Sequence, residues 1–507
     1  MKAHLMHRDR DFDLKAKLPR NADDLVQDLE LDTLFRAMAG EDKFLFEVAK
    51  VAILASVGSD APTILYRQEA LKDCIENSGV IRDVYDTVMA TIEGRRTRGG
   101  LLYLGSYPSG ILNHSVELLE GQMEGLQNLR ALADANLSRF HSEAFTTLFN
   151  TLKEELAGDF MKDVARHLQQ MKFRDGILLS ATLGDGNKAK SYILRNPSAE
   201  KRSWLQRLFG PKEEAYIFQL DPRDDAGARA LSELRDRGLN IAANAVAQSA
   251  EHILSFLHML RAELAFYIGC LNLRQRLVAK GEPIAFPVPV DAGERRHHFE
   301  GLYDVCLSLS MEKRVVGNDV DAVGKVLTIV TGANTGGKST FLRSFGLAQL
   351  MMQCGMFAPA VSFSANLCDG VFTHYKREED SSMTSGKFDE ELSRMSRIAD
   401  VLAGNSLVLF NESFAATNDR EGSEIAKMIV DVLLKKGIKM VFVTHLYAFA
   451  HAYVDGKSDD LMFLRAEREP DGTRTFKLVE AEPLRTSFGQ DLYQAVFQDG
   501  PRKNAAA

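Results

Sequence analysis

The 507-residue chain has a formal net charge of −8, an apolar share of 45% and a charged share of 26%. This balance is typical of a soluble protein with well-formed cores, and the net charge excludes a histone-like polycation. The length favours roughly two to four domains of about 100–200 residues each. The charged N-terminus has no apolar region of the kind that a secretory signal needs, and we find no uninterrupted run of the roughly 20 apolar residues that a membrane span requires.

The cysteines are scattered along the chain without paired or metal-like spacing. This pattern favours reduced thiols in a cytoplasmic protein over disulfides or a metal centre. The five are Cys74, Cys270, Cys306, Cys354 and Cys368.

Residues 1–174 are predicted to be helical, because apolar residues recur at intervals of three and four. In the segment NADDLVQDLELDTLFRAMAG, Asn21 is placed to cap the start of a helix and Gly40 to stop it. Longer runs with the same period follow at 63–94 and 141–173.

Residues 175–222 have a different pattern. DGILLSATLGDGNKAKSYILRNP contains two apolar runs around a turn of Gly, Asp and Asn, which predicts a β-hairpin. AYIFQLDP, at 215–222, is predicted to be a third short strand. A polar, basic connection at 198–214 carries the only tryptophan, Trp204.

Residues 223–284 are predicted to contain one long helix. From about Leu239 to Lys280 the chain has no proline, and it has an apolar stripe at helical spacing. Such a helix exceeds the average globular length and would act as a strut or lever. The proline-rich segment GEPIAFPVPVDAG ends it and marks a boundary near residue 285.

Residues 285–507 alternate predicted strands and helices, as in an α/β domain. The apolar segments KVLTIVTG, SLVLFNE and KMVFVTH are the predicted buried strands. The fold class is therefore multidomain: a mostly helical region with a small β-rich insertion, followed by an α/β domain.

A phosphate-binding loop follows the first of these strands. GANTGGKST fits the G-x-x-x-x-G-K-[ST] pattern and precedes a predicted helix. Backbone N–H groups and the helix N-terminus would bind phosphate, Lys338 would reach the β and γ phosphates, and the Ser339 hydroxyl would ligate Mg²⁺. The alternative is a chance glycine-rich turn. The predicted nucleotide-binding residues are Gly332, Ala333, Asn334, Thr335, Gly336, Gly337, Lys338, Ser339 and Thr340.

Around this loop the sequence resembles the MutS family of ABC-type ATPases. The likeness covers 331–360 (nucleotide loop), 369–402 (signature loop and its helix), 407–422 (Walker B and D-loop) and 441–449 (the switch histidine segment). It is looser in the helical half, where 29–40 and 66–74 resemble the family's core and lever helices. The resemblance implies a P-loop ABC-type ATPase domain at 285–507, a helical core/lever region at 1–174, a clamp-like insertion at 175–222 and a lever helix at 223–284.

The sequence also departs from the family. The core-like helices begin by residue 25, which leaves no room for the mismatch-reading and connector domains, and no Phe-x-Glu reading motif can be assigned. Where MutS has a Ser-Thr pair before its phenylalanine, this chain has Gly386 and Lys387 before Phe388, although Glu391 matches the family's glutamate. Ser385 is a candidate substitute for the signature serine. In ABC-type dimers the signature loop contacts the γ-phosphate in the partner's site. The altered loop therefore puts in question whether one subunit activates hydrolysis in the other.

The strand SLVLFNE ends in a polar pair that would serve catalysis. Glu412 is the candidate general base that orients the attacking water, and a capping carboxylate at a strand end is the alternative. Asn411 takes the place of the usual Asp and keeps an oxygen ligand without the charge. With Ser339 it would complete a Mg²⁺ site of weaker affinity and slower hydrolysis, unless hydrolysis is lost altogether.

His445 directly follows the strand KMVFVT, where the family places a histidine that senses the γ-phosphate. A histidine that ends a strand by chance is the alternative. Thr417 and Asn418 occupy the D-loop, which is a dimer contact in the family, but they could equally be plain turn residues.

Two basic clusters could follow a DNA backbone, although solvated faces are the usual explanation of such charges. The first lies in EGRRTRGG, which we expect to form a loop between helices; the second decorates the β insertion. They consist of Arg95, Arg96 and Arg98, and of Lys188, Lys190, Arg195, Lys201, Arg202 and Arg207. In RRHH, at 295–298, adjacent side chains diverge, which disfavours a metal site.

Three functions follow from these patterns. The preferred one is a homodimeric, cytoplasmic, MutS-like ATPase that uses ATP and Mg²⁺ at composite sites and grips mismatched, branched or distorted DNA. The second is a nucleotide-gated protein scaffold that binds no nucleic acid, which the acidic net charge favours. A transporter ATPase subunit fits poorly, because the helical half precedes the ATPase as a lever. No membrane partner is expected.

Overall fold

A computed structural model describes residues 1–98, 107–174, 176–187, 189–195, 219–377, 386–454, 456, 458–470 and 472–485, with the side chains of residues 95–98 and 187 left out. The chain forms two compact units. Unit 1 consists of residues 1–3, 79–140 and 146–261, and unit 2 consists of residues 4–78, 141–145 and 262–507. The division into four segments made from the sequence stays a prediction.

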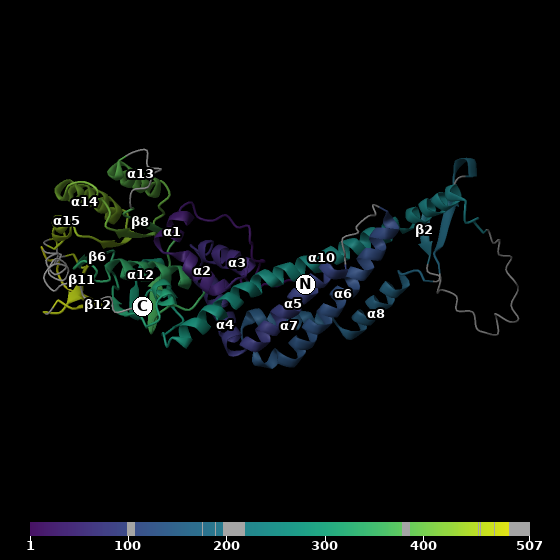
Figure 1. Ribbon diagram of the computed structural model, residues 1–507, viewed down its shortest axis with the longest axis horizontal. Helices are drawn as coiled ribbons and strands as arrows, with labels where there is room; N and C mark the ends of the chain where they lie inside the picture. The colour runs from purple at the N-terminus through teal and green to yellow at the C-terminus, as the bar shows by residue number, and fades with distance from the viewer. Residues whose placement is uncertain are drawn as a thin grey trace, which may run out of the picture. The chain divides into compact units, whose positions relative to one another are not determined.

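Unit 1 is built mainly from helices that pack lengthwise (Figure 1). Gln122 on one of them, α6, donates to the Ala250 carbonyl of α10 at 3.1 Å, and Gln169 of α8 donates to Glu120 of α6 at 3.0 Å. Helix α6 is therefore central to the bundle. The helices are α5 (Ser78–Arg98), α6 (Pro108–Asn136), η1 (Leu137–Arg139), α7 (Glu143–Glu155, which begins in unit 2), α8 (Gly158–Gln170) and α10 (Asp225–Ala279, which ends in unit 2).

The predicted hairpin is confirmed. Strands β1 (Leu178–Leu183) and β2 (Ala189–Arg195) pair antiparallel around the turn η2 (Asp185–Asn187), with a bulge between Ser180 and Thr182. The third strand, predicted at 215–222, lies mostly outside the described residues.

Two helix boundaries differ from those predicted. Helix α10 begins at Asp225 rather than near Leu239. Nearly all side chains from 225 to 237 are exposed, so this part has no buried face and leaves no apolar period in the sequence. Helix α5 continues through Gly94 to Arg98, so the first basic cluster belongs to a helix end and not to a loop. A glycine within a helix costs about 1 kcal/mol relative to alanine and does not by itself end the helix.

The first helices of unit 2 are α1 (Ala22–Asp28), α2 (Leu31–Ala39), α3 (Lys43–Leu54) and α4 (Ala61–Glu76). The segment from Asn21 to Gly40 was predicted as one helix, but Glu30 has a left-handed φ of 54° and separates α1 from α2. The break allows α1 to pack on strand β8 and α2 to pack on α3 and α11. Asn21 stands at the start of α1 without capping it and donates instead to the Val371 carbonyl at 2.7 Å.

A six-stranded sheet forms the centre of unit 2, in the order β12-β11-β6-β10-β9-β8. All its pairs are parallel except β11 with β12. The strands are β6 (Leu327–Gly332), β8 (Val371–Tyr375), β9 (Leu407–Asn411), β10 (Lys439–Val443), β11 (Leu461–Arg468) and β12 (Arg474–Glu480). The three buried strands predicted from the sequence are β6, β9 and β10.

Helices cover both faces of this sheet. Alternate residues of a strand face opposite sides, and Ile329, Phe410 and Phe442 lie in one apolar cluster with residues of α13, α14 and α15. The rings of Phe410 and Phe442 stack at 4.7 Å within it. Helix α12 packs on β6, β9 and β10. These helices are α12 (Lys338–Gln353), α13 (Lys387–Ala399), α14 (Asp419–Lys435) and α15 (Tyr447–His451).

A second sheet of unit 2 has four strands in the order β3-β7-β4-β5. Strands β3 and β7 are parallel, and β4 runs antiparallel to both β7 and β5. Its elements and the helical turns beside it are β3 (Val288–Val290), η4 (Ala292–Glu294), β4 (His297–Leu302), α11 (Val305–Ser310), β5 (Asn318–Asp321) and β7 (Ser362–Asn366).

All five cysteines are free, buried and part of unit 2. Burial raises the pKa of each thiol, to about 11 for Cys354 and about 12 for Cys368. Among the described helices, α10 alone is long and apolar enough to cross a membrane by length and composition. The protein buries 72% of that apolar stretch, as expected of a core helix.

Candidate nucleotide-binding site

The glycine-rich loop connects β6 to α12, as the sequence predicted. Gly332 and Gly337 adopt φ values of 112° and 87°, which favour glycine. A Cβ on Gly332 would also lie 2.8 Å from the backbone nitrogen of Ala466. The loop therefore depends on glycine for its backbone and for its close approach to β11.

Lys338 is folded back onto the loop that precedes it. Its Nζ donates to the carbonyls of Gly332 at 3.2 Å and Ala333 at 3.0 Å, and the residue is only 5% exposed. Burial lowers the pKa of Lys338, and the nearby Glu412 carboxylate opposes that effect. The ammonium thus lies above the loop with weak neutral acceptors, in a place where an anion would be a stronger partner.

The C-terminal ends of β8, β9 and β10 lie side by side near the loop. In the parallel register Asn411 pairs with Val443 and with Tyr375, so the residues that follow these strands lie at one edge of the sheet. The Ser339 hydroxyl donates to Asn411 Oδ1 at 3.0 Å. The residues predicted to hold a metal are therefore in contact.

Glu412 and His445 form a pair that the sequence did not predict. His445 Nε2 lies 2.9 Å from Glu412 Oε1. The hydrogen bond from His445 holds the pKa of Glu412 below its usual value, against the effect of partial burial, and the charges of Lys338 and Lys376 act in the same direction. Glu412 has a φ of 53°, and its N–H donates to the Val443 carbonyl at 2.9 Å. The carboxylate is thus held ionised and oriented.

These groups lie on a cavity of about 490 Å³. One half is polar and consists of the loop from Asn334 to Thr340 together with Glu412 and His445. The other half is mostly apolar and was not found from the sequence, because its residues belong to separate segments and follow no known motif. It is lined by Leu302, Tyr303, Leu307, Met311, Val315, Val316, Phe341 and Phe476.

Not every predicted residue lines the cavity. Gly332 and Ala333 contribute the carbonyls that hold Lys338, and Asn411 contacts Ser339. Gly386 and Lys387 begin α13, and Ser385 lies outside the described residues. Their role between subunits stays a prediction.

The D-loop residues have local partners. Asn418 caps α14 by accepting from the Glu421 N–H at 3.0 Å, and the Thr417 hydroxyl donates to the Glu421 carboxylate at 2.8 Å. Both side chains therefore act as turn and cap residues in this structure. A contact with a second subunit stays a prediction.

The adjacent histidines diverge as predicted. His297 is fully buried in β4 and stacks on Phe345 at 4.2 Å, whereas His298 is half-exposed and lies 3.5 Å from Asp321. Within the second basic cluster, Lys190 pairs with Asp185 at 3.3 Å and Arg195 donates to Ser180 at 2.9 Å. Its other members, Lys188, Lys201, Arg202 and Arg207, lie outside the described residues.

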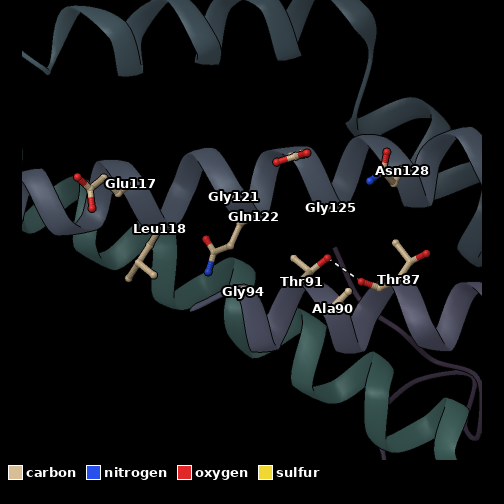
Figure 2. A pocket seen from close by; sticks show the side chains of 11 residues that line it. Thr87, Ala90, Thr91, Gly94, Glu117, Leu118, Gly121, Gln122, Gly125 and Asn128 are labelled. Atoms are coloured by element: carbon tan, nitrogen blue, oxygen red, sulfur yellow. Dashed lines mark hydrogen bonds between the residues drawn. The ribbon is translucent and has the colours of Figure 1, made fainter. Parts of the chain in front are cut away.

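A second cavity, of about 370 Å³, lies between α5 and α6 in unit 1 (Figure 2). Its lining includes glycines at 94, 121 and 125, which have no side chains to fill the space. Among the described side chains that line it, the charged ones are Glu117 and Glu124, both acidic. Such a lining repels phosphate, so the cavity of unit 2 is the better nucleotide site.

A phosphate-type loop at a helix N-terminus, facing an ionised carboxylate at the same edge of a mostly parallel sheet, is the arrangement of a nucleotide-binding protein. Two family models match the chain: "MutS2 N-terminal domain" over residues 59–280 and "MutS domain V" over residues 328–501. The chain belongs to the MutS family.

Individual relatives match less than a third of the chain. MutS protein homolog 4 of Homo sapiens is 30% identical over 152 residues, which are 30% of this chain and 16% of that protein. Endonuclease MutS2 of Lacticaseibacillus casei is 37% identical over 134 residues, covering 26% and 17%. DNA mismatch repair protein MutS of Methanococcoides burtonii is 31% identical over 162 residues, covering 29% and 18%. The chain thus matches less than a fifth of the length of these relatives.

Proposed function

We propose that this protein binds ATP with Mg²⁺, hydrolyses it slowly, and acts as a homodimeric clamp on mismatched, branched or distorted DNA in repair or recombination. The observation that carries the proposal is the convergence of Lys338, the Ser339–Asn411 contact and the Glu412–His445 pair on one cavity. The MutS domain V match spans all of these residues and supports the same conclusion.

The loop and α12 would hold the phosphates. The first N–H groups of a helix have no partner within it, and the helix dipole adds partial positive charge at the same end. Lys338 would exchange its two carbonyl partners for phosphate oxygens, which are stronger acceptors because they are charged.

The residues present fit a magnesium ion. Ser339 Oγ and Asn411 Oδ1 are oxygen donors 3.0 Å apart, and a hard cation prefers oxygen ligands. Such an ion would neutralise charge that develops on the phosphates. Because Asn411 contributes no charge, we expect weak metal binding and slow turnover.

Glu412 would accept a proton from the attacking water, since its lowered pKa keeps it ionised at neutral pH. His445 is the donor that orients the carboxylate. A γ-phosphate beside His445 would compete with Glu412 for that hydrogen bond. The hydrogen bond between His445 and Glu412 would therefore differ between a bound triphosphate and a bound diphosphate.

The apolar half of the cavity suits the nucleoside end of ATP. Phe476 and Val316 are 49% and 39% exposed although they are large apolar side chains, so a flat base would cover surface that is now in water. This arrangement orients the nucleotide with its phosphates toward Lys338.

Unit 1 would provide the DNA-binding part. The MutS2 N-terminal domain match covers most of its helices, and the exposed hairpin β1–β2 would serve as the clamp. Recognition by shape and backbone would be strongly salt-dependent. Such a protein would work in the cytoplasm, at the nucleoid.

ATPase turnover of the full chain, with and without duplex, mismatched and junction DNA, tests the proposal. Lys338→Ala should abolish nucleotide binding, because the phosphates lose their charged partner. Glu412→Gln should lower turnover by roughly 10²–10⁴-fold while nucleotide binding is kept. Unchanged turnover in Glu412→Gln would remove the assigned base.

DNA binding is tested separately by fluorescence anisotropy with labelled DNA at several salt concentrations. ATP-sensitive and salt-sensitive binding supports the clamp. A chain that hydrolyses ATP but binds none of the DNA forms would be the nucleotide-gated protein scaffold instead.

A further inference from the structure

The C-terminal end of α10 is tied to the wall of the nucleotide cavity. Gly281 has a φ of 71°, and the Glu282 N–H donates back to the Leu277 carbonyl at 3.0 Å, which closes the helix with a glycine cap. This cap fixes the directions in which the side chains of Lys280 and Glu282 leave the helix.

Both side chains hold the segment between α11 and β5. Lys280 Nζ donates to the carbonyls of Ser308 and Met311. Glu282 Oε1 accepts from the Ser308 hydroxyl and from the Val315 N–H, each at 3.0 Å. Two of these four hydrogen bonds thus reach Ser308 in α11, and the other two reach the segment itself, at Met311 and Val315.

That segment is part of the apolar wall of the cavity. Met311, Arg314, Val315 and Val316 line it, and the Glu282 side chain is fully buried behind them. The Arg314 guanidinium lies 3.6 Å from the second Glu282 oxygen. A ligand that contacts this wall therefore contacts a segment that is hydrogen-bonded to the end of α10.

We propose that Lys280 and Glu282 are positioning residues that fix the wall at residues 311–316 to the end of α10, so that nucleotide binding orders the last turns of this helix. The inference rests on the proposed nucleotide binding. Coupling is reciprocal, so the bonded helix end also raises the affinity for nucleotide. An allosteric coupling of this kind is typically worth about 5–150-fold in affinity.

Removal of the Glu282 carboxylate should loosen the wall without touching the phosphate loop. Glu282→Ala leaves the Val315 N–H and the Ser308 hydroxyl without their acceptor. We expect it to raise the Kd of the fluorescent nucleotide mant-ADP about 10-fold, with kcat at saturating ATP changed less than about 2-fold. Glu282→Gln keeps an acceptor oxygen and should restore most of the affinity, whereas a purely structural loss would change kcat and stability alike.

The control is Glu312→Ala, which removes a carboxylate from the same segment. Glu312 is exposed and does not line the cavity. Its Kd for mant-ADP should equal that of the wild type. If Glu282→Ala fails to fold, Lys280→Met, which removes the bonds to Ser308 and Met311, decides the question by the same titration. Its Kd for mant-ADP should rise, and an unchanged Kd would overturn the inference.

Hydrogen exchange of the full chain provides the second measurement. In the wild type, saturating ADP should slow exchange at the loop 332–340 and at residues 270–279 of α10. In Glu282→Ala the effect should persist at the loop and vanish at α10. Wild-type protein in which ADP protects the loop but not α10 would overturn this inference alone. Wild-type protein that binds no mant-ADP would overturn the proposed nucleotide site itself.

Discussion

Asn411 is the residue at which this site differs most from the usual P-loop pattern. It holds an amide oxygen 3.0 Å from the Ser339 hydroxyl, where a carboxylate would ordinarily face the metal. An amide oxygen coordinates a hard cation but brings no charge to it. Asn411 therefore keeps an oxygen where the metal ligand would lie but attracts a cation less strongly than an aspartate would.

Asn411→Asp should therefore strengthen the site. We expect a lower half-saturating Mg²⁺ concentration and faster turnover, because the added charge attracts the cation directly. Mg²⁺ titrations of ATPase activity measure both. Asn128→Asp makes the same charge change at an exposed position of α6 in unit 1 and should have no effect. A slower Asn411→Asp enzyme would mean that the neutral amide is required.

The Glu412–His445 pair predicts a pH dependence. A general base works when it is deprotonated, and the pKa of Glu412 lies below its ordinary 4.5, mainly because of the hydrogen bond from His445. The wild-type kcat should therefore stay level as pH falls from 7 to about 5 and decline only below the ordinary pKa of a glutamate.

His445→Gln should move this acid limb to higher pH, since the main cause of the lowered pKa is removed. His451→Gln, on α15, is the matched histidine control and should keep the wild-type profile. The measurement is kcat against pH at saturating ATP and Mg²⁺. An unmoved limb in His445→Gln would assign the acid limb to another group.

Among the elements, α5 and α6 make one close contact at Gly125, on the lining of the cavity between them. A Cβ built on Gly125 would lie 2.1 Å from Thr91 Oγ1, which is shorter than any real contact. The Thr91 hydroxyl is itself bonded to the Thr87 carbonyl at 2.7 Å (Figure 2). The two helices can approach this closely only because α6 has a glycine there.

Two alanine substitutions on the lining of this cavity should act in opposite directions. Gly125→Ala should lower the free energy of unfolding by about 1–3 kcal/mol, because the methyl group overpacks the contact. Gly94→Ala has open space around it and should raise the free energy by up to about 1 kcal/mol through helix propensity. Urea denaturation measures both. Equal effects of the two changes would contradict the packing argument.

Elements whose signal is local were predictable from the sequence. The loop from Gly332 to Ser339 follows from its spacing, and the hairpin β1–β2 follows from its turn. The first turns of α10 were missed because their side chains are exposed and show no period. The break at Glu30 was missed because partners distant in sequence stabilise it, including Arg343, which bonds its carboxylate. The apolar wall of the cavity, from Leu302 to Phe476, required the tertiary fold.

At the scale of the whole molecule, unit 2 is assembled from segments that are far apart in the sequence. Its N-terminal residues are held by side chains of α4 and α10. The buried Glu263 carboxylate accepts from the N–H groups of Leu5, Met6 and Phe12, and Arg67 donates to the Met6 carbonyl at 2.9 Å. Residues 5–12 are therefore held within unit 2, which also contains the candidate nucleotide site.

Glu263 predicts how stability depends on pH. Burial raises its pKa to about 7 from an ordinary 4.5, against the effect of its backbone donors. The folded state thus binds this proton more tightly than the unfolded chain does. The contribution to stability is complete below pH 4.5 and is lost as pH rises through 7.

The comparison with Glu263→Gln isolates this contribution, because glutamine does not titrate. The difference in free energy of unfolding, wild type minus variant, should fall by roughly 2–3 kcal/mol between pH 5 and pH 8. Urea denaturation at several pH values measures it. Glu233→Gln, at an exposed position of α10, is the matched control. If the difference in free energy of unfolding between wild type and Glu263→Gln did not change with pH, the Glu263 carboxylate would have an ordinary pKa.

The placement of the cysteines makes the chain convenient for labelling. All five thiols are buried in unit 2, and burial raises their pKa values, so in the folded protein they are protected from alkylating dyes. The sequence of unit 1 contains no cysteine. A single cysteine introduced at Ile241, which is 78% exposed, would therefore accept a fluorophore without removal of any native thiol. Because of the same protection, the rate at which the unaltered chain takes up dye would measure how often unit 2 opens.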